Sequence, residues 1–392
     1  MTYPECLLHL QRLERAGMRF GFERLRRALP WLAEPWLGET GWPRYIHVAG
    51  TNGKGSVARM IGAMLTAGGV RAGLFTSPVA TTLCDTITID GQAIGEDELA
   101  ALVTRFADAD LSAFETLTAV ALTCFRNVDI AVLECGMGGR DDATNIIPPP
   151  LAAVLTPIAL DHAAQLGGTL ASIAAHKCGI IKPPCRVVTT PKQEPEVLEI
   201  IMETAAARRL PVEMPGEEAV DVPLLGDFQA DNARLAMQAV RPYVTEVAMA
   251  AGLRGVTMPC RQELLGDVLL DGGHNPHAVA ALARTVERLY PERRAALLLG
   301  MFADKDVAAC AAMLTPLFHT VYCVTAPHER ALPAEQLAAL CGGTVREIDD
   351  VPAERPLVVA GSFSLCAYIR TYIHNCTGPV KTDNRQKPPV VG

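Results

Sequence analysis

Short apolar runs alternate with longer stretches of helical periodicity along nearly the whole chain. In the first part we expect strands at residues 45–49, 72–75, 129–133, 152–155 and 187–189 and helices at residues 57–67, 114–125 and 229–240. Strands that alternate with helices pair in parallel and are covered by those helices. The pattern therefore predicts an α/β fold with parallel sheets.

A proline- and glycine-containing stretch, residues 241–259, is interpreted as the connection to a second, smaller α/β unit. In that unit we expect strands at residues 268–270, 295–299, 321–324 and 357–360 and a helix at residues 278–289. We therefore predict a first domain over residues 1–245 and a second over 256–375. The polar segment 376–392 is expected to be a disordered tail.

Composition narrows the class of protein. The chain has 392 residues, of which 49% are hydrophobic and 20% charged, as in ordinary globular enzymes. A net charge of -8 gives no general attraction to nucleic acid or to an anionic membrane. No secretory signal and no long apolar span is recognised. The 12 cysteines form no Cys-x-x-Cys pair, which favours reduced core thiols over zinc or disulfides. We expect a cytoplasmic monomer whose partners are small-molecule substrates.

The strongest chemical signal follows the first predicted strand and precedes the first predicted helix. It is the segment Gly50, Thr51, Asn52, Gly53, Lys54, Gly55 and Ser56. Glycines allow backbone N–H groups to turn toward an anion, and the helix N-terminus adds partial positive charge. Lys54 can place an ammonium on terminal phosphates, and Ser56 offers a hydroxyl to Mg²⁺. The alternative is an ordinary strand-to-helix turn, which the coincidence of glycine, lysine and serine with the correct flanks disfavours.

A second candidate site begins at Glu134, after another predicted strand, and continues through a glycine-rich stretch to Asn145. The carboxyl ends of parallel strands are where α/β sheets hold ligands. A carboxylate there is a suitable oxygen ligand for Mg²⁺. On these residues alone, a turn-capping acid beside a flexible loop is an equally good interpretation.

Residues 47–56 and 134–145 resemble the nucleotide loop and the Glu-x-Gly-x-Gly-Gly-x-x-Asp-Ala-Thr-Asn motif of the folylpolyglutamate and dihydrofolate synthases of the Mur ligase superfamily. The resemblance implies a P-loop-containing parallel-sheet domain followed by a smaller Rossmann-like α/β domain. It also implies a ligase that uses ATP and Mg²⁺, with two ions expected, to join a carboxylic acid to an amino acid. The amino acid would be L-glutamate, and the acid would pass through an acyl-phosphate.

The same resemblance assigns further residues across the chain. It implies metal contacts from Ser56, Ser77, Glu134, His162 and Lys177, the last of these as a carbamate. It implies nucleotide contacts from Asn232, Arg261 and Asp271 in addition to the loop of residues 50–56. The catalytic residues would be Lys54, His162, Lys177 and His274. The alternatives are a solvated helix residue for Lys177 and a helix-capping residue for Asn232.

One loop, residues 76–87, departs from the family pattern. Ser77 is kept, but the usual histidine after the Ser-Pro pair is absent, and Leu83, Asp85 and Thr86 stand where the family has Phe, Glu and Arg. An aromatic face and an arginine are suited to holding a pterin-like ring and a carboxylate. A related ligase for a non-folate acid or another amino acid therefore stays open. A nucleotide-binding regulator is disfavoured because a pure binder needs no acyl-phosphate site.

Overall fold

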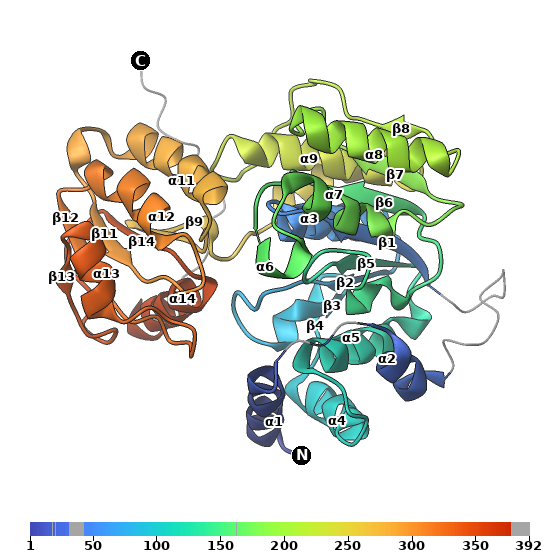
Figure 1. The fold of residues 1–392 in the computed structure, drawn as a ribbon, viewed down its shortest axis with the longest axis horizontal. Helices are drawn as coiled ribbons and strands as arrows, with labels where there is room; N and C mark the ends of the chain where they lie inside the picture. The colour runs from blue at the N-terminus through green and yellow to red at the C-terminus, as the bar shows by residue number, and fades with distance from the viewer. Residues whose placement is uncertain (18, 20, 31–42, 162, 378–392) are drawn as a thin grey trace. The chain divides into compact units, whose positions relative to one another are not determined.

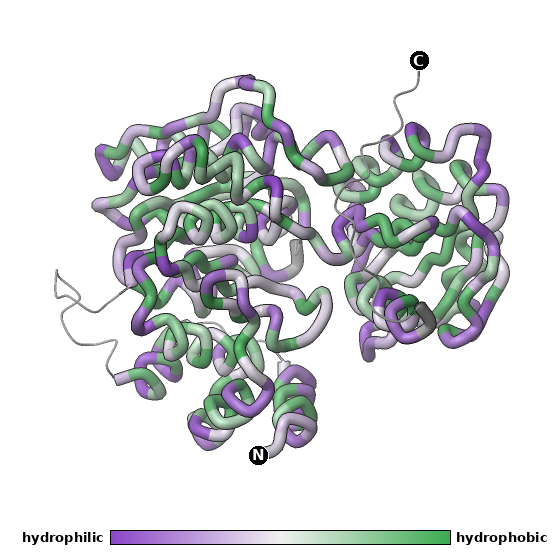
Figure 2. The backbone as a smooth tube through the Cα atoms, turned by 180° about the vertical axis from the view of Figure 1, so that it is seen from behind, coloured by the Kyte–Doolittle hydropathy of each residue, from purple (hydrophilic) through white to green (hydrophobic). Residues whose placement is uncertain are grey.

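The computed structural model describes residues 1–377 except for 18, 20, 31–42 and 162. The chain divides into two compact units, which are described separately (Figure 1). Unit 1 comprises Met1–Met258 and Asn275–Leu289, and unit 2 comprises Pro259–His274 and Tyr290–Gly392. Figure 2 shows hydrophobic stretches, in green, within both units and hydrophilic residues, in purple, at many outer turns.

Unit 1 is built on an eight-stranded sheet with the order β4-β3-β2-β5-β1-β6-β7-β8. Its strands are β1 (Arg44–Ala49), β2 (Ala72–Phe75), β3 (Ile87–Ile89), β4 (Gln92–Ala93), β5 (Ile130–Glu134), β6 (Ala152–Leu155), β7 (Arg186–Thr189) and β8 (Val212–Glu213). Strands β2, β5, β1, β6, β7 and β8 pair in parallel. Strands β3 and β4 continue the β2 edge in antiparallel pairs. The parallel strands end at one common edge, which is where ligands bind in such sheets.

Helices cover both faces of this sheet (Figure 1). They are α1 (Tyr3–Arg15), α2 (Glu23–Ala28), α3 (Lys54–Ala67), α4 (Glu96–Phe106), α5 (Ala113–Cys124), α6 (Ala163–Leu166), α7 (Leu170–Lys177), α8 (Pro195–Ala207), α9 (Phe228–Val240) and α10 (Glu246–Gly255). Helix α11 (Pro276–Leu289) comes later in the chain and is not one of the helices that cover this sheet in Figure 1. Alternate residues of β1 enter different cores. Ile46 and Val48 pack with α3, α9 and α10, whereas Tyr45 packs with the core of α1, α4 and α5. The central strand is therefore buried on both faces.

Helix α10 corrects one sequence expectation, because it occupies most of the segment that we interpreted as a connection. Thr245 caps it by accepting a hydrogen bond from the backbone N–H of Ala248. Gly252 brings it close to α3, since a Cβ there would lie 2.6 Å from the Cα of Met64. The proline and glycines of residues 241–259 mark the ends and the packing face of a helix. They do not mark an open linker.

Unit 2 contains a six-stranded sheet with the order β13-β12-β11-β14-β10-β9. Its elements are β9 (Arg261–Leu265), β10 (Val268–Asp271), β11 (Ala296–Leu299), α12 (Val307–Leu314), β12 (Thr320–Cys323), α13 (Ala334–Cys341), β13 (Thr344–Val345), β14 (Leu357–Ala360) and α14 (Phe363–Thr377). All neighbouring strands are parallel except β9, which is antiparallel to β10. The core includes Leu270, Leu298 and Val359, which lie on three adjacent strands.

The two parallel-rich sheets confirm the α/β fold class predicted from the sequence. Boundaries differ by a few residues: β5 includes Glu134 as its last residue, and α3 begins at Lys54 and not at residue 57. From residue 378 onward, the predicted tail lies outside the described residues. None of the helices in the described ranges combines the length and apolar character needed to cross a membrane.

Candidate active site

The loop that joins β1 to α3 turns through two glycines in the left-handed region. Gly50 has a φ of 149° and Gly53 a φ of 85°, which glycine adopts without a steric penalty. The backbone N–H groups of Thr51 and Asn52 both donate to the carbonyl oxygen of Pro157, at 2.9 and 3.2 Å. These bonds tie the loop to the segment after β6. The backbone therefore holds the loop in shape without help from a ligand.

The N-terminus of α3 is open at this loop. Gly53 occupies the capping position, and among the described residues no side chain caps the helix. The N–H groups of a first helical turn need acceptors from outside the helix, and an anion supplies them. The Lys54 ammonium donates to the carbonyl oxygen of Thr51 at 3.2 Å, and Ser56 is buried in the same turn. The arrangement fits a phosphate.

The glycines also admit close neighbours. A Cβ at Gly50 would lie 1.9 Å from Oγ1 of Thr156, and one at Gly53 would lie 2.6 Å from Oδ1 of Asn232. Asn232 is buried on α9, and its Nδ2 donates to Oε1 of Gln229 at 3.1 Å. The asparagine singled out as a nucleotide contact therefore lies directly against the phosphate loop. Its proximity explains why only glycine fits at position 53.

Two candidate metal ligands meet at the ends of neighbouring strands. Glu134 ends β5, where it pairs in register with Val48 of β1, and Ser77 lies just beyond the end of β2. The backbone N–H of Ser77 donates to Oε2 of Glu134 at 2.9 Å. The Glu134 side chain is almost fully buried. The sheet order β2-β5-β1 thus places Ser77, Glu134 and the phosphate loop at one edge.

Lys177 reaches the same edge from the end of α7. Its side chain is buried, and Nζ donates to the carbonyl oxygen of Gly50 at 2.7 Å. Burial, followed by the positive charge of Lys54, lowers the pKa of Lys177 to about 7. A substantial fraction of this amine is therefore neutral near physiological pH. His162, the other candidate ligand of this segment, lies outside the described residues.

The glycine-rich loop after Glu134 packs directly on the end of α7. A Cβ at Gly139 would lie 2.8 Å from the carbonyl oxygen of Lys177. The N–H of Arg140 donates to the carbonyl oxygen of His176 at 2.8 Å. The glycine therefore permits the close approach that brings Lys177 toward the phosphate loop.

An aromatic side chain that the sequence analysis did not single out lies beside this loop. Phe114 stacks on Phe75, the last residue of β2, with ring centroids 5.7 Å apart. A Cβ at Gly136 would lie 2.6 Å from the Phe114 ring. Phe114 therefore borders both the strand that leads to Ser77 and the loop that follows Glu134.

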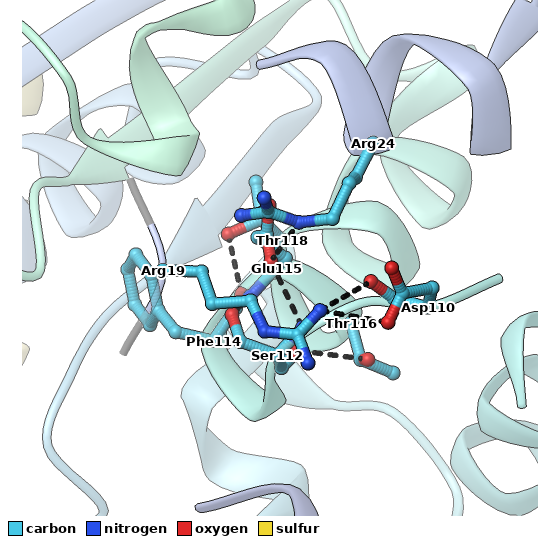
Figure 3. A network of polar contacts seen from close by, with 8 residues as sticks. All are labelled: Arg19, Arg24, Asp110, Ser112, Phe114, Glu115, Thr116 and Thr118. Carbon is cyan, nitrogen blue, oxygen red and sulfur yellow. Dashed lines mark hydrogen bonds and ion pairs between the residues drawn. The ribbon is translucent and has the colours of Figure 1, made fainter. Parts of the chain in front are cut away.

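A polar network fixes the start of the helix that carries Phe114 (Figure 3). Glu115 is buried and accepts a hydrogen bond from Arg24 at 2.9 Å and another from the backbone N–H of Ser112 at 2.9 Å. Arg19 and Asp110 form a more exposed ion pair beside it, at 2.7 Å. The spacing of Ser112 and Glu115 is a capping-box signal visible in the sequence. Arg24 is 91 positions away from Glu115, and no local pattern could have identified that partnership.

The divergent loop of residues 76–87 folds on itself. The Asp85 carboxylate accepts hydrogen bonds from Thr81, from the Thr82 hydroxyl at 2.7 Å and from the Thr82 backbone N–H at 3.0 Å. Burial alone would raise the pKa of Asp85, but these hydrogen bonds outweigh it and lower the pKa. Arg59 of α3 donates to the hydroxyl of Thr76 at 3.2 Å at the base of the loop. Asp85 is therefore used to stabilise the loop.

In unit 2, Asp271 lies at the end of β10, where its carboxylate accepts hydrogen bonds from two backbone N–H groups. These belong to Gly273, at 2.7 Å, and to Gln262, at 3.1 Å. Burial raises the pKa of Asp271 to about 6 despite these bonds and the nearby Arg261. Cys260 adopts a φ of 57° in the left-handed region.

Arg261 and His274 share one aromatic neighbour. The Arg261 guanidinium carbon lies 4.7 Å from the centroid of the Phe363 ring, and the His274 ring packs edge-on to it at 6.3 Å. Nδ1 of His274 is 2.9 Å from the carbonyl oxygen of Gly272. Unit 2 therefore gathers Arg261, Asp271 and His274 around one turn. Phe363, the first residue of α14, is a member that was not predicted from the sequence.

Two family models of known protein domains match separate parts of this chain. Residues 48–207 match the Mur ligase middle domain, and residues 260–358 match the Mur ligase glutamate ligase domain. The folylpolyglutamate synthase of Lacticaseibacillus casei is 33% identical, and the match covers 94% of this chain and 98% of that protein. The chain belongs to the folylpolyglutamate synthase family.

Solved structures of this family are similar over nearly the full length. A FolC of Escherichia coli in complex with DHPP and ADP has a TM-score of 0.84 and 28% identity, and the match covers 96% of this chain and 98% of that one. A bifunctional folylpolyglutamate synthase/dihydrofolate synthase of Yersinia pestis, complexed with AMPPNP and Mn, has a TM-score of 0.81 and 26% identity, with 95% and 98% covered. These proteins bind adenine nucleotides, and one of them binds a divalent metal.

Proposed function

We propose that this chain is an ATP-dependent ligase that joins a carboxylic acid to the amine of L-glutamate through an acyl-phosphate, in the manner of dihydrofolate and folylpolyglutamate synthases. The observation that carries the proposal is the convergence at the carboxyl edge of the unit 1 sheet. There the open N-terminus of α3, the buried Glu134 and the Nζ of Lys177 lie within one set of neighbouring strand ends.

Each unit has its own proposed nucleotide contacts. The loop of residues 50–56 binds the phosphates through backbone N–H groups, and Lys54 offsets their charge. Asn232 contributes from beside Gly53. Arg261, Asp271 and His274 are the contributions of unit 2: Arg261 to a phosphate, Asp271 to the ribose and His274 near the reacting phosphoryl group.

The residues present fit Mg²⁺. The candidate ligands are the hydroxyls of Ser56 and Ser77, the Glu134 carboxylate, His162 and Lys177. Among the described residues, no group of three His, Cys, Asp or Glu could hold a metal by itself. Such a sparse donor set suits Mg²⁺, which is often bound through one or two carboxylates together with substrate phosphates. When bound, Mg²⁺ neutralises charge on the transferring phosphoryl group.

Carbamylation of Lys177 would complete this donor set. A lysine reacts with CO₂ only as the neutral amine, and the pKa of about 7 supplies that form. The product is an anionic oxygen ligand in place of a cation. With ¹³C-bicarbonate, the protein should show a carbamate carbon signal that disappears in Lys177→Arg. An identical signal in that variant would exclude Lys177 as its source.

The chemistry explains why these side chains are needed. Oxide is a poor leaving group, so a carboxylate does not acylate an amine directly. Attack of a carboxylate oxygen on the terminal phosphorus of ATP releases ADP and gives an acyl-phosphate. The glutamate amine then attacks the acyl carbon, and inorganic phosphate leaves. Lys54 stabilises the charge on the phosphoryl group during transfer, and holding the three reactants together supplies much of the remaining rate enhancement.

The acid substrate is the part of the proposal with two candidates. Phe114, which borders Gly136 and Phe75, offers an aromatic face for a pterin-like ring and favours a folate-type acid. The second candidate is a non-folate acid, or an amino acid other than glutamate. The loop of residues 76–87 favours this alternative, because Asp85 is engaged with Thr81 and Thr82 in place of the family's Glu and Arg pattern.

A substrate screen tests the proposal. Purified protein is incubated with ATP, Mg²⁺, each candidate acid and each amino acid, and ADP release and product mass are measured. Dihydropteroate or a folate with L-glutamate should release ADP and give a product one glutamyl residue heavier. A different productive pair would establish the second candidate. Amide formation without ADP release, or no amide with any pair, would overturn the proposed ligase activity.

A further inference from the structure

A chain of buried side chains links β1 to the loop that follows Glu134. His47 lies on β1, three residues before Gly50, and its side chain is fully buried. Its Nε2 is 2.8 Å from the Thr144 hydroxyl oxygen, which in turn lies 2.5 Å from Oδ1 of Asp142. Thr144 is also fully buried, and Asp142 nearly so. None of these three residues has a role in the function proposed above.

Asp142 closes the glycine-rich loop. One carboxylate oxygen accepts a hydrogen bond from the N–H of Met137 at 2.8 Å, and the other accepts from the N–H of Thr144 at 3.0 Å. The carboxylate therefore joins the beginning and the end of a loop that starts at the metal-ligand candidate Glu134. Whatever holds Asp142 and Thr144 in place also limits where that loop can lie.

The direction of the hydrogen bonds follows from the proton count. The Thr144 hydroxyl has one proton, and the 2.5 Å separation from Asp142 is typical of a hydroxyl that donates to a carboxylate. The backbone N–H groups on Asp142 likewise favour its ionised form, although burial raises its pKa. With its proton given to Asp142, Thr144 can only accept from His47. The hydrogen of the imidazole is then on Nε2, which also lies 3.1 Å from Sγ of Cys135, a weaker second acceptor for the same N–H.

The other ring nitrogen agrees with this assignment. Nδ1 of His47 is buried, and no hydrogen-bond partner for it is present in the described part of the chain. If the ring hydrogen is on Nε2, Nδ1 is only an unpaired acceptor. If it were on Nδ1, a buried N–H donor would lack a partner, which costs more free energy. Burial and the nearby positive charge of Lys182 hold the pKa of His47 well below its usual range. The imidazole is therefore neutral.

We propose that His47 is a positioning residue of the ligase site, which donates from Nε2 to Thr144 and so fixes the Asp142-closed loop, with Glu134 at its start, against the strand that ends in the phosphate loop. The inference rests on the proposed function only for its effect on the reaction. The hydrogen-bond chain itself is a property of the protein without substrates. Residues that orient metal ligands in this way typically change metal affinity or activity by about 10- to 100-fold when they are removed.

Four variants separate positioning from packing. His47→Leu and Thr144→Val each break the chain, and His47→Gln retains a side-chain N–H donor near the position of Nε2. The double variant His47→Leu/Thr144→Val tests whether both residues act through one path. Ile46→Val on the same strand is the matched control, because its side chain enters a different core. Thermal melts and circular dichroism establish which variants fold.

For kinetics, we expect His47→Leu and Thr144→Val each to lower kcat and to raise the half-saturating Mg²⁺ concentration by about 10-fold or more. The KM for the amino acid should change little. The double variant should be no less active than the less active of the two single variants. His47→Gln should recover much of the lost activity, and Ile46→Val should have the kinetics of the wild type. The proposal would be overturned if the losses of activity in the two single variants multiplied in the double variant. It would also be overturned if folded His47→Gln and His47→Leu proteins lost the same amount of activity.

Two measurements without catalysis separate this inference from the proposed function. Histidine-selective ¹⁵N labelling, with His47→Gln to assign the signal, should show His47 as the Nε2–H tautomer. An Nδ1–H tautomer or an imidazolium would overturn the proposal. Calorimetric binding of an ATP analogue with Mg²⁺ should weaken in Thr144→Val and not in Ile46→Val. If the wild type made no amide product, the proposed function would fail, and these two measurements would still decide the role of His47.

Discussion

The Nζ of Lys177, at the end of α7, lies 2.7 Å from the carbonyl oxygen of Gly50, the first residue of the phosphate loop. Two segments 127 positions apart in the sequence therefore meet at one point. Gly139 lies against the backbone of Lys177, where a Cβ would be 2.8 Å from the Lys177 carbonyl oxygen. It also places a buried amine next to the charge of Lys54, which contributes to its lowered pKa.

The lowered pKa predicts a pH dependence of stability in the unmodified protein. Between pH 7 and about 10.5, the unfolded chain carries a proton on Lys177 that the folded chain has lost. Unfolding then takes up a proton, so the free energy of unfolding rises with pH across this window. We expect Tm to increase more between pH 7 and pH 9.5 in the wild type than in Lys177→Met. Parallel Tm curves for the two proteins would contradict the assignment.

Removal of the Lys54 ammonium should abolish ligation and leave the fold intact. Lys54→Ala removes the positive charge proposed to stabilise phosphoryl transfer, so we expect kcat to fall by about 100- to 1,000-fold or more. Lys192→Ala is the control, because this lysine is mostly exposed and pairs with Asp231 at the surface. Its kcat should stay within a factor of two or so of the wild type. Near-normal product formation by a folded Lys54→Ala protein would remove the phosphate-loop assignment.

Loss of the Glu134 carboxylate should change the metal requirement. In Glu134→Ala we expect the half-saturating Mg²⁺ concentration to rise by about 10-fold or more, because an oxygen ligand is lost. Glu134→Gln keeps an oxygen that can accept from the N–H of Ser77, so it separates loss of charge from collapse of that contact. An unchanged Mg²⁺ titration in both variants would indicate that Glu134 is structural.

The close approach at Gly53 gives a prediction with an internal control. Gly53→Ala places a Cβ 2.6 Å from Oδ1 of Asn232 and adds the cost of a left-handed alanine, about 1–2 kcal/mol. Gly69 has a similar φ of 75° with nothing within 4 Å of a Cβ. Gly69→Ala should therefore carry the cost of the left-handed backbone but not the steric clash. Binding of an ATP analogue should weaken strongly in Gly53→Ala and stay normal in Gly69→Ala. Equal binding in the two variants would count against a phosphate site at Gly53.

Much of the fold was predictable because its strands are buried on both faces. Runs such as residues 152–155 are apolar at every position, which is typical of central parallel strands. The helix Glu246–Gly255 was not predicted, because its glycines resemble a linker in sequence. In the structure, only a residue without a side chain fits at position 252, because α3 passes close to Gly252. That reason depends on a partner more than 180 positions away.

The site shows the same division between local and distant information. Lys54 and Glu134 were identified because each follows a strand in a recognisable local pattern. The sequence did not reveal the contact of Phe114 with Gly136, the pair of Arg24 and Glu115, or the chain from His47 to Asp142. These contacts join segments whose spacing along the chain carries no periodic signal. They depend on the order of strands in the sheet, which local patterns do not specify.

Transfer of ¹⁸O from the acid substrate tests the central claim most directly. The productive acid is labelled in its carboxylate, and the inorganic phosphate released during ligation is analysed by mass spectrometry. If the carboxylate attacks the terminal phosphorus of ATP and the amine later displaces phosphate, each phosphate should carry one oxygen from the acid. Unlabelled phosphate formed together with amide product, or label found in AMP, would contradict an acyl-phosphate route.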